Sequence, residues 1–237
     1  MSRRMPAATK ALLTGAAAVG LGWAGYAALA WSRYGRVVPR DGADMLLDRF
    51  MPTYEVAERH QTRVAAPAPL TWQAASDLDF GRSPLVRAIF QGRELLMGAH
   101  PAQRTRRKFL DEILALGWGL LAEEPGYKLA FGAATQPWQA DVRFRPLGPE
   151  TFAAFAEPGY AKITWTLAAE PRGSSASLFR TETRVATTDP DSRRRFRRYW
   201  AVFSPGILLI RYEMLRLVRA EAERLARALP AITNPSG

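Results

Sequence analysis

Histidine supplies much of the acid–base and metal-binding chemistry available near neutral pH, and this chain of 237 residues has two histidines, His60 and His100. Alternating side chains from Tyr54 to Ala65 predict a strand that places His60 on the same face as Val56. Three interpretations of His60 stay open: a ligand contact in a pocket, a core histidine with satisfied hydrogen bonds, or an acid–base catalyst. His100 is expected in a solvated loop.

The other residue types that do chemistry occur in no recognisable catalytic pattern. The chain has no cysteine, which excludes disulfides, thiolate metal sites and cysteine nucleophiles. Carboxylate pairs fall where exposed turns or helix faces are expected, and no glycine-rich phosphate loop, nucleophile elbow or metal-ligand cluster is present. We therefore predict no catalytic residue, no metal and no cofactor, and we favour a binding protein over an enzyme.

The last long segment, from Asp189 to Leu229, has the periodicity of one amphipathic helix. Its large apolar residues recur at steps of four and three: Phe196, Trp200, Phe203, Ile207, Ile210, Met214 and Leu217. Pro205 interrupts this pattern, so the helix is expected either to kink or to restart with Ser204 as the cap of a second helix. A broad apolar surface must lie beneath such a stripe.

The elements before this helix predict an α+β domain. After the strand at 54–65 come short helices at 70–76 and from Pro84, a helix at 105–116, and a run of strands separated by glycine and proline turns. The strands are expected at 119–123, 127–133, 151–156, 161–169 and 176–187, with a further one at 142–145. This order predicts an antiparallel sheet that wraps the final helix.

Several of these segments resemble one protein family. The motifs are Tyr54-Glu55-Val56 with Glu58-Arg59-His60, Val64-Ala65-Ala66-Pro67 with Trp72, the stretch Ser83 to Ala88, Phe155 to Lys162, Thr181 to Val185, and Arg195 to Trp200. Together they are similar to the START-related helix-grip superfamily (SRPBCC), which includes polyketide cyclase-like and lipid-transport proteins. The resemblance covers about Asp48 to Ala228. It implies six to seven curved antiparallel strands around the long helix.

The resemblance also implies a cavity between sheet and helix that holds a lipid, isoprenoid or polyketide-like compound. The residues expected to line it are His60, Trp72, Phe131, Trp138, Trp165, Arg184, Trp200, Phe203 and Ile207. For each aromatic residue an ordinary core position is the alternative. The function expected is binding or transport of a hydrophobic molecule, and the alternative is a cyclase or dehydratase that uses His60 as acid or base.

The N-terminus and the net charge of +11 indicate a membrane address. Residues 11–32 are uncharged and would measure about 33 Å as a helix, enough to cross a hydrocarbon core of about 30 Å. We expect a single-pass anchor of the cell membrane. The alternatives are a cleaved export signal and a helix lying on the membrane surface. Basic residues on both sides leave the orientation undetermined.

Four parts of the chain follow from these patterns: an anchor at 1–33, a connector at 34–47, the helix-grip domain at 48–229 and a polar tail at 230–237. The run Arg193, Arg194, Arg197 and Arg198 is expected to form a solvated helix face or to contact anionic lipid. No nucleic-acid-binding module is recognisable, so nucleic acid is not an expected partner.

Overall fold

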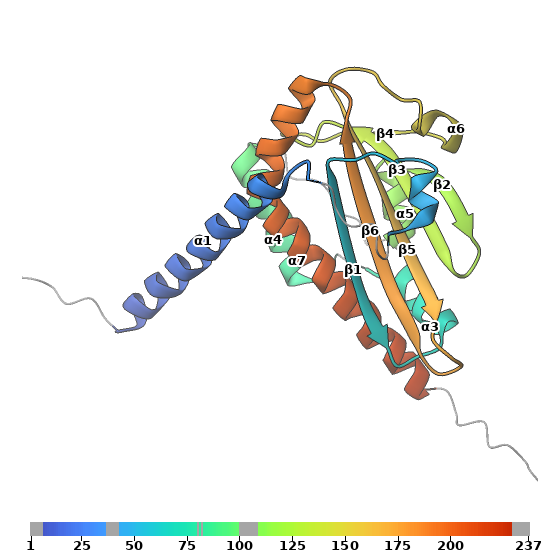
Figure 1. Ribbon diagram of the computed structural model, residues 1–237. Helices are drawn as coiled ribbons and strands as arrows, with labels where there is room; N and C mark the ends of the chain where they lie inside the picture. Colours follow the sequence, from blue (N-terminus) through green and yellow to red (C-terminus); the bar gives the residue numbers. More distant parts are fainter. Residues whose placement is uncertain (1–6, 37–42, 80, 82, 100–108, 229–237) are drawn as a thin grey trace, which may run out of the picture.

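A computed structural model describes residues 7–36, 43–79, 81, 83–99 and 109–228 (Figure 1). His100, residues 105–108 of the predicted helix and the predicted tail 230–237 lie outside the described residues. The elements in chain order are α1 (Ala7–Arg33), α2 (Met45–Asp48), β1 (Val56–Val64), α3 (Ala68–Ser76), α4 (Pro84–Met97), α5 (Phe109–Ala115), β2 (Gly119–Glu124), β3 (Lys128–Thr135), β4 (Phe144–Pro146), α6 (Pro149–Phe152), β5 (Ala161–Pro171), β6 (Ser177–Thr187) and α7 (Pro190–Ala228).

The α+β architecture expected from the sequence is confirmed. Six antiparallel strands form one sheet in the order β1-β6-β5-β3-β2, with β4 paired to β3. The long helix α7 runs along one face of this sheet (Figure 1). We call this the inner face and the opposite one, covered by α2 and α6, the outer face.

Alternation along the strands decides which residues meet α7. In β3 the odd-numbered Leu129 and Phe131 belong to an inner apolar cluster, whereas Ala130 and Ala134 pack on the outer face. Phe131 stacks on Trp165 of β5 with ring centroids 4.8 Å apart. Both side chains are almost fully buried, so the middle of the inner face is a packed core.

The helix α7 is continuous over 39 residues, with Pro205 inside it. Asp189 caps its first turn by accepting hydrogen bonds from the backbone N–H groups of Asp191 and Ser192, both at 2.9 Å. Hydrogen bonds from the Ser192 hydroxyl and the Gly159 N–H, together with these two capping bonds, hold the pKa of the Asp189 carboxyl well below its usual range. The predicted restart at Ser204 is wrong, because the helix does not end there and the Ser204 hydroxyl has no hydrogen-bond partner among the described residues.

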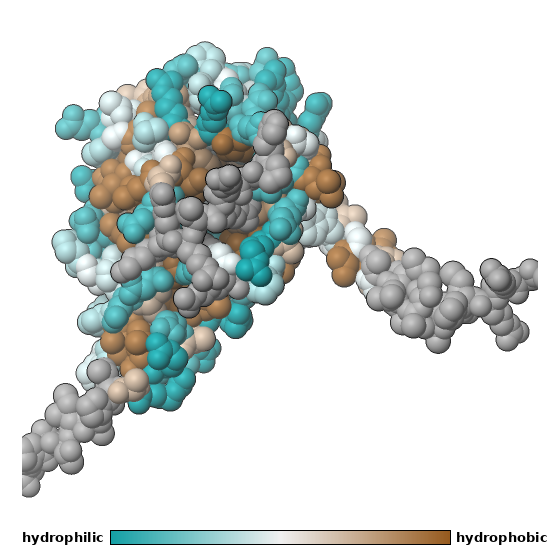
Figure 2. Space-filling model, turned by 180° about the vertical axis from the view of Figure 1, so that it is seen from behind, coloured by the Kyte–Doolittle hydropathy of each residue, from teal (hydrophilic) through white to brown (hydrophobic). Residues whose placement is uncertain are grey.

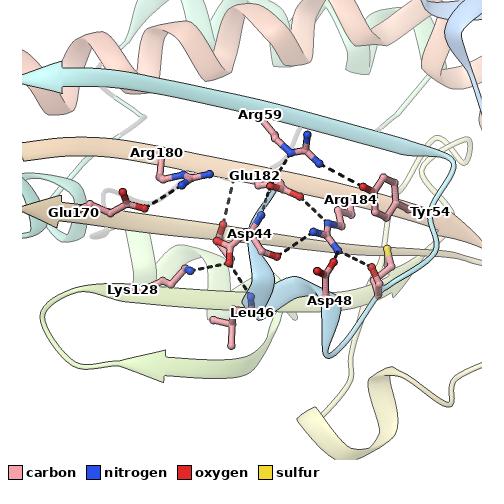
Figure 3. A network of polar contacts seen from close by, with 12 residues as sticks. Asp44, Leu46, Asp48, Tyr54, Arg59, Lys128, Glu170, Arg180, Glu182 and Arg184 are labelled. Carbon is pink, nitrogen blue, oxygen red and sulfur yellow. Dashed lines mark hydrogen bonds and ion pairs between the residues drawn. The ribbon is translucent and has the colours of Figure 1, made fainter. Parts of the chain in front are cut away.

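The outer face holds a network of buried charges that the sequence did not reveal (Figure 3). Arg184 of β6 is fully buried and donates to Glu182 Oε1 at 2.7 Å and to Asp48 Oδ1 at 2.6 Å. It also donates to the carbonyls of Met51 and Asp44. The Arg184 guanidinium therefore fastens α2 and the chain around it to the outer face of the sheet.

This position corrects the predicted role of Arg184. We expected it to line a cavity beneath α7 together with His60, but even-numbered residues of β6 point to the outer face. Arg184 pairs in register with Ala57, whereas His60 pairs with Thr181 on the inner face. A one-residue difference in register is enough to place a side chain on the opposite side of a sheet.

One predicted strand is absent. Residues 151–156 were expected to be extended, but the structure has the short helix α6, with Pro149 in its first turn. Phe152 at the end of α6 is fully buried against the outer face, beside Ala130, Ala134 and Leu147. The apolar side chain that suggested a strand is buried by a helical turn instead.

The helix α1 extends away from the sheet at its N-terminal half, as Figure 1 shows, and its C-terminal half lies against α7. In the part of the chain that the structure describes, no helix combines the length and hydropathy needed to cross a membrane, so the expected transmembrane segment is not found there. Figure 2 shows further apolar side chains exposed on the back of the molecule. Large apolar residues are exposed along α4 and α5 and directly after α5: Leu85, Phe90, Leu95, Leu96, Leu114 and Leu116.

Replacing Arg184 with methionine should lower the free energy of unfolding by about 3 kcal/mol, because it leaves Glu182 and the carbonyls of Met51 and Asp44 buried without this donor. Urea denaturation of the full chain followed by circular dichroism measures this change. Arg194→Met is the matched control, since Arg194 and Asp191 form an exposed pair worth less than about 1 kcal/mol. Equal losses for the two variants would contradict this account of the network.

Candidate functional site

A groove of about 390 Å³ lies between α1, the start of β1 and α7. Its lining is mixed, with aromatic and aliphatic side chains beside charged ones: Tyr26, Leu29, Ala30, Arg33, Tyr34, Arg36, Glu55, Val56, Ala57, Glu58 and Trp200. We call it the α1 groove. Its volume is within the range of small-molecule sites, and its wall on one side is the edge strand β1.

Three contacts hold α1 in place over this groove. The indole N–H of Trp23 donates to the carbonyl of Val202 at 2.9 Å. Arg197 donates to the carbonyl of Trp31 at 3.1 Å, and its guanidinium carbon lies 4.1 Å from the centre of the Trp31 ring. Arg197, expected to contact anionic lipid, is therefore engaged with α1, while Arg193, Arg194 and Arg198 are exposed.

Gly206 allows α1 to approach α7 closely. A Cβ atom at this position would lie 3.4 Å from the Trp23 ring and 3.0 Å from Ile89 of α4. The missing side chain therefore leaves room for both neighbours at one point of α7. Gly206 lies directly after Pro205, the proline inside α7.

A belt of polar residues crosses the inner face next to the α1 groove. Its strand residues are Glu58 and His60 of β1 and Thr181 and Thr183 of β6, which form the cross-strand pairs Glu58–Thr183 and His60–Thr181. Its helix residues are Ser204 and Arg211 of α7, seven positions apart and so on one side of the helix. We call these six residues the polar belt.

The polar belt separates two apolar clusters beneath α7. The cluster toward the N-terminal half of α7 contains Ala30, Val56, Ala161, Val185, Phe196 and Trp200. The cluster toward its C-terminal half includes Val64, Phe131, Trp165, Phe179, Met214, Leu215 and Val218. The α1 groove opens on the first cluster, because Ala30, Val56 and Trp200 belong to both.

Arg211 is the most unusual member of the polar belt. Its Nη2 donates to Thr183 Oγ1 at 2.7 Å, and its guanidinium carbon lies 5.7 Å from the centre of the Trp165 ring. Burial lowers the pKa of the Arg211 guanidinium from its usual 12.5 to about 10, and the charge of Glu58 opposes this shift. A cation is thus held over the core with a hydroxyl as its hydrogen-bond partner.

His60 lies at the other end of the polar belt. Its side chain is 8% exposed, and Nε2 is 3.5 Å from Glu58 Oε2 with no hydrogen-bond partner among the described residues. The ring packs edge-on against Tyr212 of α7, with centroids 5.4 Å apart. The predicted inward orientation of His60 is therefore confirmed.

The remaining predicted ligand contacts are dispersed. Trp200 lines the α1 groove, and Ile207 packs beside it on the same apolar cluster. Phe131 and Trp165 lie in the other cluster, with Trp72 packed against it. Phe203 packs on Tyr199, with ring centroids 4.9 Å apart. Their contact with a ligand stays a prediction.

The loop that contains Trp138, one of the residues expected to line the cavity, is tied to α4. Arg93 donates to the carbonyls of Pro137 at 3.3 Å and Gln139 at 3.0 Å. Trp138 itself packs against the N-terminal apolar cluster, and its indole N–H has no hydrogen-bond partner among the described residues. Contact of Trp138 with a ligand stays a prediction.

Neither a protein-family model nor a curated protein matches this sequence. Among solved structures, the chain is similar to a polyketide-cyclase-like protein of Corynebacterium glutamicum, with 12% identity over 76% of this chain and 99% of that chain and a TM-score of 0.36. It is also similar to an aromatase/cyclase of Streptomyces sp. R1128 (16% identity, 75% and 99% covered, TM-score 0.27). A third is norcoclaurine synthase of Thalictrum flavum, in complex with dopamine and hydroxybenzaldehyde (13% identity, 74% and 88% covered, TM-score 0.29). At these scores the likeness adds no argument about this chain.

Replacing Gly206 with leucine should displace α1 from α7, because the new side chain would occupy the space of the Trp23 ring and Ile89. Hydrogen exchange by mass spectrometry should then show faster exchange of the amides of residues 24–33. Gly92→Leu in α4 is the control, since nothing lies within 4 Å of a Cβ atom at Gly92. Unchanged exchange in Gly206→Leu would contradict the role of this close approach.

Proposed function

We propose that this protein binds a hydrophobic small molecule in the α1 groove, with α1 as the wall that retains it. The observation that supports this best is the groove itself, a space of about 390 Å³ whose apolar walls come from Leu29, Val56 and Trp200. Apolar walls supply affinity in proportion to the area they remove from water, and a few polar groups orient the ligand.

This location differs from the cavity expected from the sequence. The space between α7 and the middle of the sheet is filled by stacked Phe131 and Trp165 and by Met214, all at most 3% exposed. A second pocket, of about 440 Å³, lies beside α2 on the outer face and is lined mainly by charged and polar groups, including Asp44, Lys128 and Arg180. The α1 groove has more aromatic and aliphatic side chains in its lining than the second pocket, which supports it as the place for a hydrophobic ligand.

The same helix would bring the groove to a membrane. Val19 and Leu21, in the part of α1 beyond its contacts with α7, are 69% and 76% exposed. Such side chains gain free energy by entering the boundary between lipid head groups and acyl chains. We assign the protein to the membrane surface on this basis, where it would take up or release its ligand.

Filling the groove should abolish binding. In Val56→Phe a ring replaces the smaller side chain of a groove residue on the inner face of β1, so that the full chain should bind the neutral fluorescent probe N-phenyl-1-naphthylamine at least about tenfold more weakly. Thr62→Phe, on the same strand and face as Val56 but outside the groove, is the matched control. If the wild-type chain does not bind the probe, or if both variants bind it equally, the groove is not the site.

Membrane attachment is tested by flotation of the full chain with phosphatidylcholine vesicles on a sucrose gradient. The wild-type chain should float with the vesicles, and the double variant Val19→Asp/Leu21→Asp should stay at the bottom because two charges would have to enter the lipid. Met45→Asp is the control, since Met45 is 82% exposed on the far side of the sheet. Flotation of the double variant would exclude α1 as the attachment.

Acid–base catalysis by His60 is a second candidate function. The observation that favours it is the free Nε2, 3.5 Å from a Glu58 carboxylate that also lines the groove. A bound ketone offers a direct test in D₂O, because His60 would remove a proton from the carbon next to the carbonyl and return a deuteron. Mass spectrometry of 2-dodecanone should show this exchange with the wild-type chain and not with His60→Gln. Equal exchange with both would exclude His60.

A further inference from the structure

The polar belt has more hydrogen-bonding groups than its described neighbours satisfy. The hydroxyls of Thr181 and Ser204 and Nε2 of His60 have no hydrogen-bond partner among the described residues. Thr181 is 2% exposed, Ser204 is 1% exposed, and the His60 side chain is 8% exposed. A buried polar group without a partner is rare, because it loses its water without compensation. Three such groups in one belt, on two strands and the facing helix, indicate a missing partner.

The charge of Arg211 indicates the nature of that partner. Within the described residues, no carboxylate lies within the 4.0 Å of an ion pair with Arg211, and its printed hydrogen bond goes to the neutral Thr183 hydroxyl. Arg184 of β6, by contrast, has two carboxylates and two carbonyls as partners. Arg211 is therefore desolvated with less compensation than Arg184, and an oxyanion would complete its surroundings.

The position of Glu58 limits the charge of that oxyanion. Glu58 is 30% exposed by its side chain, lies near His60 and attracts Arg211 at longer range. Its negative charge offsets part of the positive potential in the belt. A single negative charge is therefore favoured over the double charge of a phosphate monoester, and a carboxylate matches the guanidinium in geometry.

We propose that the polar belt binds the carboxylate of an amphipathic acid whose apolar body lies in the α1 groove. This inference rests on the proposed function, since it assigns a polar end to the ligand of the same groove. Glu58 lines the groove, and His60 is two residues further along the same face of β1, about 7 Å away. The carboxylate accepts from Arg211 and from the Thr181 and Ser204 hydroxyls, while the N-terminal apolar cluster contacts the chain of the ligand.

Competition between matched amphiphiles tests this assignment. The full chain is loaded with N-phenyl-1-naphthylamine, and the probe is displaced with dodecanoate, 1-dodecanol or dodecyl phosphate, each below its critical micelle concentration. Dodecanoate should displace the probe at a concentration about 10- to 100-fold lower than the alcohol, the gain expected from charge-assisted hydrogen bonds. Dodecyl phosphate should be weaker than dodecanoate.

Arg211→Gln should remove the preference for the acid while it still binds the probe and the alcohol. Arg219→Gln, an exposed arginine of the same helix, should retain the preference. If circular dichroism shows that Arg211→Gln does not fold, the variant Thr181→Val/Ser204→Ala provides the test. It removes the two hydroxyls that would donate hydrogen bonds to the carboxylate, and it should reduce the preference for the acid severalfold.

The outcomes separate this inference from the proposed function. Equal displacement by dodecanoate and dodecanol from the wild-type chain would overturn the carboxylate site and leave a hydrophobic groove intact. Stronger displacement by dodecyl phosphate would overturn the choice of a single charge. Failure of the probe to bind the wild-type chain would overturn the proposed function itself.

Discussion

The periodicity of α7 is the constraint on which the rest of the structure depends. A helix that lies along a sheet must direct one side chain in every three or four toward it. From Phe196 and Trp200 the inward positions continue through Ser204 and Arg211 to Leu215 and Val218. The inner face therefore receives two polar side chains in the middle of an apolar stripe, and the polar threonines of β6 face them. The polar belt follows from this geometry.

Strong sequence patterns predicted the main elements, and weaker ones did not. Alternation along β1, the glycine and proline turns between the later strands, and the periodicity of the last helix predicted the α+β architecture. The stripe predicted for α7 was traced through apolar residues only, including Phe203 and Ile210, so it missed Ser204 and Arg211. These two residues lie four and eleven positions after Trp200 and therefore on the same side of the helix. The network of Arg184 was also missed, since its partner Asp48 is 136 positions away and no local pattern reports such a contact.

The two faces of the sheet show how differently buried charge is used. On the outer face Arg184, Arg59 and Lys128 each meet a carboxylate, and the result is a fastening for α2. On the inner face Arg211 meets a hydroxyl and an aromatic ring beside unpartnered polar groups. Complete pairing suits a structural role, and incomplete pairing suits recognition of a ligand. The helix α1, held by Trp23 and Arg197, completes the groove that leads to this inner site.

The central claim is that the α1 groove receives an apolar molecule. Amide hydrogen exchange of the full chain, with and without N-phenyl-1-naphthylamine, tests it most directly. We predict that the bound probe slows amide exchange at residues 24–33 of α1, at Tyr34 directly after it, and at residues 56–58 of β1. Exchange of the amides around α2 should be unchanged. Protection that is confined to other elements while the probe is bound would contradict the claim.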